Sequence, residues 1–210
     1  MKRYVIDTNL FFNMGSGLGF GKTTQGVVEK ITQIMRSEGV KENIELLVPP
    51  RVVDEFLSFF EDKEQLFIKD FLGVLSVKSP DAGSLTVPAT IFAEMVKDVR
   101  TRSYRGLRIG EEEIVRTAKE CVGTSNLSAV ELQKKTGEFI KSFRDRYRNA
   151  TRTGFLDSSA DLDLILLAKE QDAFLVTADE GVVQWGRLFG VKEVTPEVFG
   201  RSLENESRSR

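Results

Sequence analysis

Short apolar runs alternate with amphipathic segments in the first part of the chain. The runs at 2–6, 46–48 and 74–78 are short and rich in β-branched or aliphatic residues, as buried strands are. Amphipathic segments follow two of these runs and predict helices at 23–37, from Pro50 onward and at about 63–72. This alternation is typical of a doubly wound α/β fold with a parallel sheet.

From about residue 88 the pattern changes. Helices are predicted at 89–102, 111–121 and 128–151 with no strand between them, and the turn-forming run 123–126 suggests a helical hairpin or small bundle. The α/β pattern then returns, with a helix from Asp157, a strand at 174–177, a helix at 180–188 and a strand near 192–194. We therefore expect one α/β domain in two parts, 1–88 and 154–200, a helical insert at 89–153 and a frayed polar tail at 201–210.

Composition excludes several classes of chemistry. The chain has no histidine, which rules out Ser-His-Asp and Cys-His catalysis and histidine-ligated zinc. Cys121 is the single cysteine, so no intramolecular disulfide can form, and this fits a reducing cytoplasm, where we expect the protein to act. We expect no membrane segment or secretory leader. The net charge is −2, so any surface that binds nucleic acid must be local.

Four aspartates are placed to form one site. Asp7 directly follows the first strand and Asp179 follows the strand at 174–177, and ligands gather at the carboxyl ends of parallel strands. Asp157 and Asp161 are four residues apart and would share one side of a helix that covers both. Carboxylates held close together repel one another unless a cation neutralises them, so we expect Mg²⁺ or Mn²⁺, bound by Asp7, Asp161 and Asp179.

Two further acidic residues are possible members of this site. Asp163 falls nearly opposite Asp161 on an ideal helix, which favours a supporting or surface role, and Glu55 lies one turn into the helix after Pro50. Each also has an ordinary explanation. An aspartate such as Asp157 commonly caps a helix, and a glutamate such as Glu55 is commonly solvated.

The glycine-rich run 17–23 resembles a phosphate-binding P-loop. That motif needs a glycine at the position where Ser16 stands, and it should follow its strand more closely than this run does. An NTPase is the alternative that this run leaves open. We favour a glycine-rich loop beside the site, with Lys22 near a phosphate.

Two predicted helices are locally basic. Segment 97–108 has five basic residues against Asp98, and segment 134–152 has seven against two acids. One side of the second helix is basic, and the opposite side is apolar, with Arg146 falling toward it. We expect a phosphate-tracking surface made by Lys141, Arg144, Arg148 and Arg152, with Arg105 and Arg108 from the first helix. The apolar side, with Phe139 and Phe143, must be covered by the partner helix or by another subunit.

These motifs resemble PIN-type nucleases, and most closely the minimal protein-only ribonuclease P family known as HARP, also called RNA-ligase partner proteins. The resemblance covers most of the chain. It rests on Val5-Ile6-Asp7-Thr8-Asn9, Asp98-Val99-Arg100-Thr101-Arg102, Gly106-Leu107-Arg108, Gly154-Phe155-Leu156-Asp157, Ala160-Asp161-Leu162-Asp163 and Thr177-Ala178-Asp179-Glu180-Gly181. The glycine-rich run 15–21 and the loop 123–127 are not features of that family.

The resemblance implies a PIN-like parallel sheet with an inserted helical spike and Mg²⁺- or Mn²⁺-dependent RNA cleavage. It implies catalytic roles for Asp7, Asp157, Asp161 and Asp179, and places Arg144 and Arg148 on the spike that holds the tRNA body. It also implies a homo-oligomer with paired spikes, which is a dodecamer in the family.

Three functions follow as hypotheses. The favoured one is an endoribonuclease that removes the 5′ leader of precursor tRNA and leaves a 5′-phosphate. The second is another PIN-type ribonuclease, toxin-like or general. The third is a non-catalytic RNA-binding partner of an RNA ligase.

Overall fold

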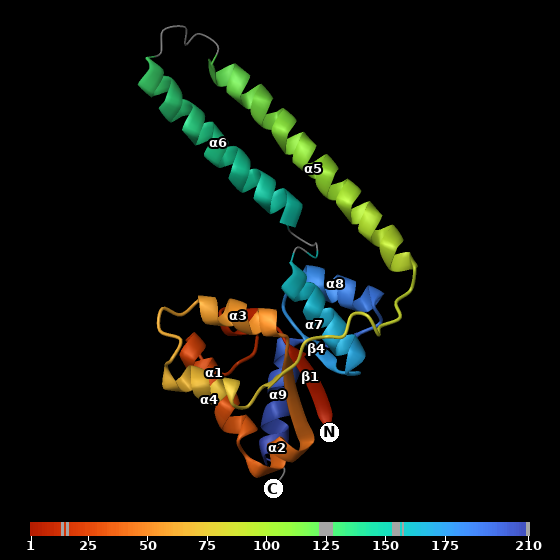
Figure 1. Cartoon of the computed structure of the whole chain (residues 1–210). Helices are drawn as coiled ribbons and strands as arrows, with labels where there is room; N and C mark the ends of the chain where they lie inside the picture. Colours follow the sequence, from red (N-terminus) through yellow and green to blue (C-terminus); the bar gives the residue numbers. More distant parts are fainter. Residues whose placement is uncertain (14, 16, 122–127, 153–155, 157, 209–210) are drawn as a thin grey trace. The chain divides into compact units, whose positions relative to one another are not determined.

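The central element is a five-stranded, all-parallel sheet. The computed structural model describes residues 1–13, 15, 17–121, 128–152, 156 and 158–208. The strand order is β3-β2-β1-β4-β5 (Figure 1), with β1 Lys2–Ile6, β2 Ile44–Val48, β3 Ser76–Val77, β4 Phe174–Val176 and β5 Lys192–Val194. The predicted α/β fold with a parallel sheet is confirmed. Because β2 and β3 lie on one side of β1 and β4 and β5 on the other, the topological switch point falls between β1 and β4.

Helices flank this sheet. The short 3₁₀ helix η1 (Thr8–Phe11) follows β1, and α7 contacts β1 and β4 while α1 packs with α4 and α9. The bounds are α1 Thr24–Met35, α2 Glu38–Asn43, α3 Pro50–Ser58, α4 Leu66–Leu72, α7 Ser159–Glu170, α8 Glu180–Leu188 and α9 Pro196–Arg208. The short helix α2 was not predicted.

Phenylalanine side chains fix the segments that follow β1 and β2. Phe11 of η1 packs edge-on against Phe71 of α4 and Phe56 of α3, with ring centroids 5.2 and 6.1 Å apart. All three rings are fully buried. Edge-to-face pairs at these separations are favourable beyond the area that they bury. The chain immediately after Asp7 is therefore anchored in the core.

The helical insert forms a compact unit of its own. The chain divides into one unit of Met1–Pro88 with Leu156–Arg210 and a second of Ala89–Phe155. Within the second unit α5 (Thr90–Cys121) and α6 (Ala129–Arg152) lie side by side (Figure 1). The described part of this unit is a two-helix hairpin. Among the residues that the structure describes, no helix is long and apolar enough to cross a bilayer.

The prediction of two separate helices at 89–102 and 111–121 is wrong, because α5 is continuous across this stretch. Gly106 is buried inside it, and a Cβ atom placed there would lie 2.6 Å from Cε2 of Tyr147 on α6. A glycine costs about 1 kcal/mol of helix propensity relative to alanine. Close approach of the two helices explains why it is present.

The observed bounds of α9 and α7 differ from the predicted ones. The predicted polar tail at 201–210 belongs largely to α9, which extends to Arg208 and has Leu203 completely buried. The helix expected from Asp157 begins at Ser159, after the N-cap residue Ser158, whose hydroxyl accepts the Asp161 N–H at 3.0 Å. The prediction that this helix starts at Asp157 is therefore wrong. Asp157 itself lies outside the described residues.

Gly200 provides a test of how α9 packs on the glycine-rich loop. A Cβ atom at Gly200 would lie 2.7 Å from the Leu18 carbonyl oxygen. Overpacking costs about 1–3 kcal/mol, which outweighs the roughly 1 kcal/mol gained in helix propensity. We expect Gly200→Ala to lower the free energy of unfolding, measured by urea denaturation followed by circular dichroism. Gly137→Ala on α6 is the control, because nothing lies within 4 Å of that position. Equal or greater stability of Gly200→Ala would contradict the packing.

Candidate functional site

Asp7 is a buried carboxylate at the carboxyl end of β1. Its side chain is 3% exposed, and its backbone N–H donates to the Val176 carbonyl of β4 at 3.0 Å. The carboxylate caps η1 by accepting the Asn9 N–H at Oδ1, 3.0 Å away. Its other oxygen, Oδ2, accepts the Thr177 hydroxyl at 2.8 Å. Both oxygens of Asp7 are therefore held, one by the helix η1 that follows β1 and the other by Thr177, the residue after β4.

Thr177 connects Asp7 to Asp179. While its hydroxyl donates to Asp7, the same oxygen accepts the Asp179 N–H at 3.0 Å. The Asp179 carboxylate is exposed and caps α8 by accepting the Val182 N–H at 3.0 Å. Asp7 and Asp179 thus lie at the same edge of the sheet, at the switch point between β1 and β4.

Asp161 completes a group of three interacting carboxylates. The pKa of Asp7 is raised from 3.8 to about 6, chiefly because the carboxyl is buried. The hydrogen bonds from Asn9 and Thr177 lower this pKa, and the negative charges of Asp161 and Asp179 contribute to the rise. Because that repulsion requires proximity, the first turn of α7 must bring Asp161 close to Asp7.

The remaining predicted acids behave differently from one another. Asp163 forms an ion pair with Arg51, whose Nη1 lies 2.9 Å from Asp163 Oδ2, and this pair links α3 to α7. Glu55 is exposed on α3. The carboxylate of Asp163 is thus already paired with a cation of the protein, Arg51. Asp157 lies outside the described residues.

The donor set fits a hard divalent cation. It consists of carboxylates, one of them buried, and oxygen ligands of this kind suit Mg²⁺ and Mn²⁺. In the described ranges no group of three or more aspartate, glutamate or cysteine side chains is arranged so that it could hold a metal ion. The three carboxylates lie close enough to interact, so a bound cation would relieve their repulsion.

The predicted RNA-binding residues all lie on the hairpin, on α5 and α6. Lys141, Arg144 and Arg148 are exposed, and within the described part of the chain they have no ion-pair partner. Arg152 and Arg105 are exposed as well. Arg108 is exposed but pairs with Glu112, with its Nε 3.1 Å from Oε1.

Two residues of this region were not predicted from the sequence: Thr177, which links Asp7 to Asp179, and Ser158, which caps α7. A hydroxyl residue between the end of a buried strand and an acidic helix cap is a weak signal by itself, because such residues are common in turns. Its partner Asp7 is 170 residues away in the sequence. The strand pairing had to be known before the contact could be inferred.

Comparison with known proteins gives the family. Residues 3–207 match the model of the PINc domain ribonuclease family. A protein of Nitrosococcus oceani named RNA-free ribonuclease P is 35% identical over 98% of this chain and 96% of its own length. Proteins with the same name in Methanocaldococcus jannaschii (33% identical, 97% and 91% covered) and Thermodesulfovibrio yellowstonii (32%, 94% and 91%) are similar over nearly the whole chain. The chain therefore belongs to the PINc domain ribonuclease family, together with proteins named RNA-free ribonuclease P.

Proposed function

We propose that the protein is a metal-dependent endoribonuclease that removes the 5′ leader of precursor tRNA. The observation that carries the proposal is the buried Asp7, which interacts with Asp161 and Asp179 at the switch point of a PIN-family sheet. The relatives named RNA-free ribonuclease P support the choice of substrate.

In this proposal Asp7, Asp161 and Asp179 hold Mg²⁺ or Mn²⁺, and Asp157 is a further ligand or orients the attacking water. The metal, when bound, supplies an activated water and stabilises the leaving oxygen. Thr177 keeps Asp7 in place by its hydrogen bond, and the caps at Asn9 and Val182 fix one oxygen each of Asp7 and Asp179. Asp163 is tied to Arg51 and has a supporting role. The products would be a tRNA with a 5′-phosphate and a leader with a 3′-hydroxyl.

The exposed cations of α6 would hold the body of the tRNA. Lys141, Arg144, Arg148 and Arg152 lie on one side of the helix, and successive phosphates of a structured RNA present a matching row of negative charge. Recognition by phosphates would select shape rather than base sequence.

The hairpin would also pair with a second copy of the chain. A groove between α5 and α6 is lined mainly by apolar side chains, including Ile114, Leu132, Phe139, Ile140 and Phe143. Ile114 is 71% exposed and Ile140 is 44% exposed, so the partner helix does not cover them. A homo-oligomer built from paired hairpins would bury this surface, as patches of this kind usually require.

Cleavage of a 5′-extended tRNA tests the activity. We expect the wild-type protein to cut it at the mature 5′ end with Mg²⁺ and to leave it intact with EDTA. Asp7→Asn should reduce the rate at least about 100-fold, the scale of losing a group that holds or orients the reactants. Asp172→Asn, at the opposite edge of the sheet, is the control and should cleave normally. Equal cleavage of unstructured RNA would favour a general PIN ribonuclease.

The free energy of unfolding of Asp7→Asn shows whether a loss of cleavage could come from a loss of folding. A carboxyl whose pKa is raised on folding, here from 3.8 to about 6, binds its proton more tightly in the folded state, so stability falls as pH rises through this range. One pKa unit corresponds to about 1.36 kcal/mol, so the free energy of unfolding of the metal-free wild type falls by about 3 kcal/mol between low pH and pH 7. Asp7→Asn removes this loss and should be at least as stable at pH 7 in EDTA, measured by urea denaturation with Trp185 fluorescence. A clearly less stable variant would contradict the argument.

The basic row is tested by removing two of its charges. Arg144→Ala with Arg148→Ala should weaken binding of precursor tRNA and reduce the slope of log affinity against log salt by about 1 for each residue. Lys30→Ala with Lys41→Ala removes the same charge from the other unit and should leave the slope unchanged. Filter binding or fluorescence anisotropy between 50 and 200 mM salt, the range over which such contacts change affinity by about 10³-fold or more, measures both. Equal slopes for the two double variants would refute the assignment.

Hairpin pairing is tested by placing a charge in the apolar groove. Ile114→Glu should shift the assembly toward the monomer, because an ionised carboxylate in a buried interface is unpaired and costly. Leu66→Glu is the matched control, since Leu66 is 74% exposed on α4 of the other unit. Sedimentation velocity gives the mass of each species. If Ile114→Glu sediments as the wild type does, the groove is not the interface.

A further inference from the structure

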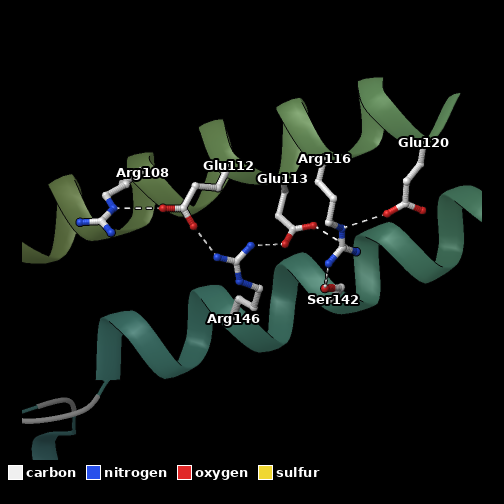
Figure 2. Close-up of polar contacts among 7 residues, drawn as sticks. All are labelled: Arg108, Glu112, Glu113, Arg116, Glu120, Ser142 and Arg146. Carbon is white, nitrogen blue, oxygen red and sulfur yellow. Dashed lines mark hydrogen bonds and ion pairs between the residues drawn. The ribbon is translucent and has the colours of Figure 1, made fainter. Parts of the chain in front are cut away.

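A row of alternating charges joins α5 to α6 (Figure 2). Arg146 of α6 donates from Nη1 to Glu113 and from Nη2 to Glu112, both on α5. The row continues along α5 from Glu113 to Arg116, whose Nη2 lies 3.3 Å from Glu113 Oε2. Arg116 also reaches across to α6, where its Nη1 donates to the Ser142 hydroxyl at 3.1 Å.

The centre of this row is buried. The Glu113 side chain is only 6% exposed, and that of Arg146 is 38% exposed. Among the described residues of α6 none is buried, and in α5 only Ile91, Gly106 and Glu113 are. The interface between the two helices therefore has no large, fully buried apolar side chain along α6 to define how the helices meet.

Arg146 lies on the side of α6 that faces α5. Arg144 and Arg148 are two residues before and after it, and at about 100° per residue they point about 160° away. The contacts agree with this geometry, because Ser142 and Phe139 lie on the same side as Arg146 and both contact Arg116 of α5. While Arg146 faces inward, Arg144 and Arg148 face solvent.

We propose that Glu113 and Arg146 are a positioning pair that sets the register and rotational phase of α6, so that its basic side faces outward to receive RNA phosphates. The last part rests on the proposed RNA binding by this hairpin. A slide of α6 by one turn, about 5.4 Å, would replace Arg146 with an uncharged neighbour such as Ser142 or Ala150. Glu113 would then lose its main partner while buried, which is strongly unfavourable.

Replacing both partners with apolar residues separates positioning from simple stabilisation. A buried ion pair exchanged for apolar side chains of similar size often leaves a protein equally or more stable, whereas the pair's contribution to a unique geometry is lost. We expect Glu113→Met with Arg146→Met to unfold at the same temperature as the wild type or higher, and yet to bind precursor tRNA about tenfold more weakly because the phosphate contacts are no longer aligned. Arg146→Lys keeps the charge pair and should retain binding. Lys134→Met with Glu138→Met removes one exposed charge of each sign from α6 and is the control.

A second readout does not depend on RNA. Spin labels on cysteines introduced at Lys119 and Glu138, with Cys121→Ser, report the arrangement of α5 and α6 by electron–electron distance measurement. We expect one narrow distance distribution in the otherwise wild-type protein and in Arg146→Lys, and a broad or double distribution in the Met pair variant. A narrow, unchanged distribution in the Met pair variant would overturn the proposal whatever its RNA affinity. If that distribution broadens while Arg144→Ala with Arg148→Ala binds RNA normally, positioning of α6 stands and the proposed RNA surface fails.

Discussion

The pairing of β1 with β4 is the constraint on which the site depends. It places the Asp7 N–H on the Val176 carbonyl and brings Thr177 within 2.8 Å of the Asp7 carboxylate. Through the same hydroxyl, the position of Asp179 at the start of α8 is coupled to Asp7. Burying Asp7 beside two other carboxylates is unfavourable, and its raised pKa expresses that cost. Residues held in such an environment are typical of functional sites, where a ligand or reaction uses the stored repulsion.

Most of the sheet was predictable because parallel strands are buried on both faces and read as continuous apolar runs. The strand at 2–6 and the helix at 180–188 match β1 and α8 residue for residue. What failed was local reasoning about polar and glycine residues. The stretch between the two helices predicted at 89–102 and 111–121 is helical, and Tyr147, which packs on Gly106 of this stretch, lies on a different element, α6. The end of the chain looked polar, yet Phe199 and Leu203, one turn apart on α9, are both completely buried.

The site was predictable in kind but not in detail. The sequence shows that Asp7 and Asp179 each follow a strand. That these two strands, β1 and β4, are adjacent in the sheet follows only from the topology. Asp163 could not be assigned, because its partner Arg51 is 112 residues away. The start of α7 was misjudged because an aspartate and a serine are equally good N-caps. Ser158 takes that role.

The number of basic residues in segment 134–152 overstates the positive charge that the hairpin exposes without a partner. Of the basic residues between 134 and 152, Arg146 is neutralised by two glutamates and Lys135 donates to the Glu120 carbonyl at 3.0 Å. On the opposite side of α6, Lys141, Arg144 and Arg148 are exposed and have no ion-pair partner in the described part of the chain. The Arg51–Asp163 pair shows that a cation beside an acid of α7 pairs with it. Cations gathered around Asp7 would neutralise the carboxylates and weaken their affinity for a metal ion. The exposed cations of α6 and the carboxylates Asp7, Asp161 and Asp179 are carried by different compact units of the chain.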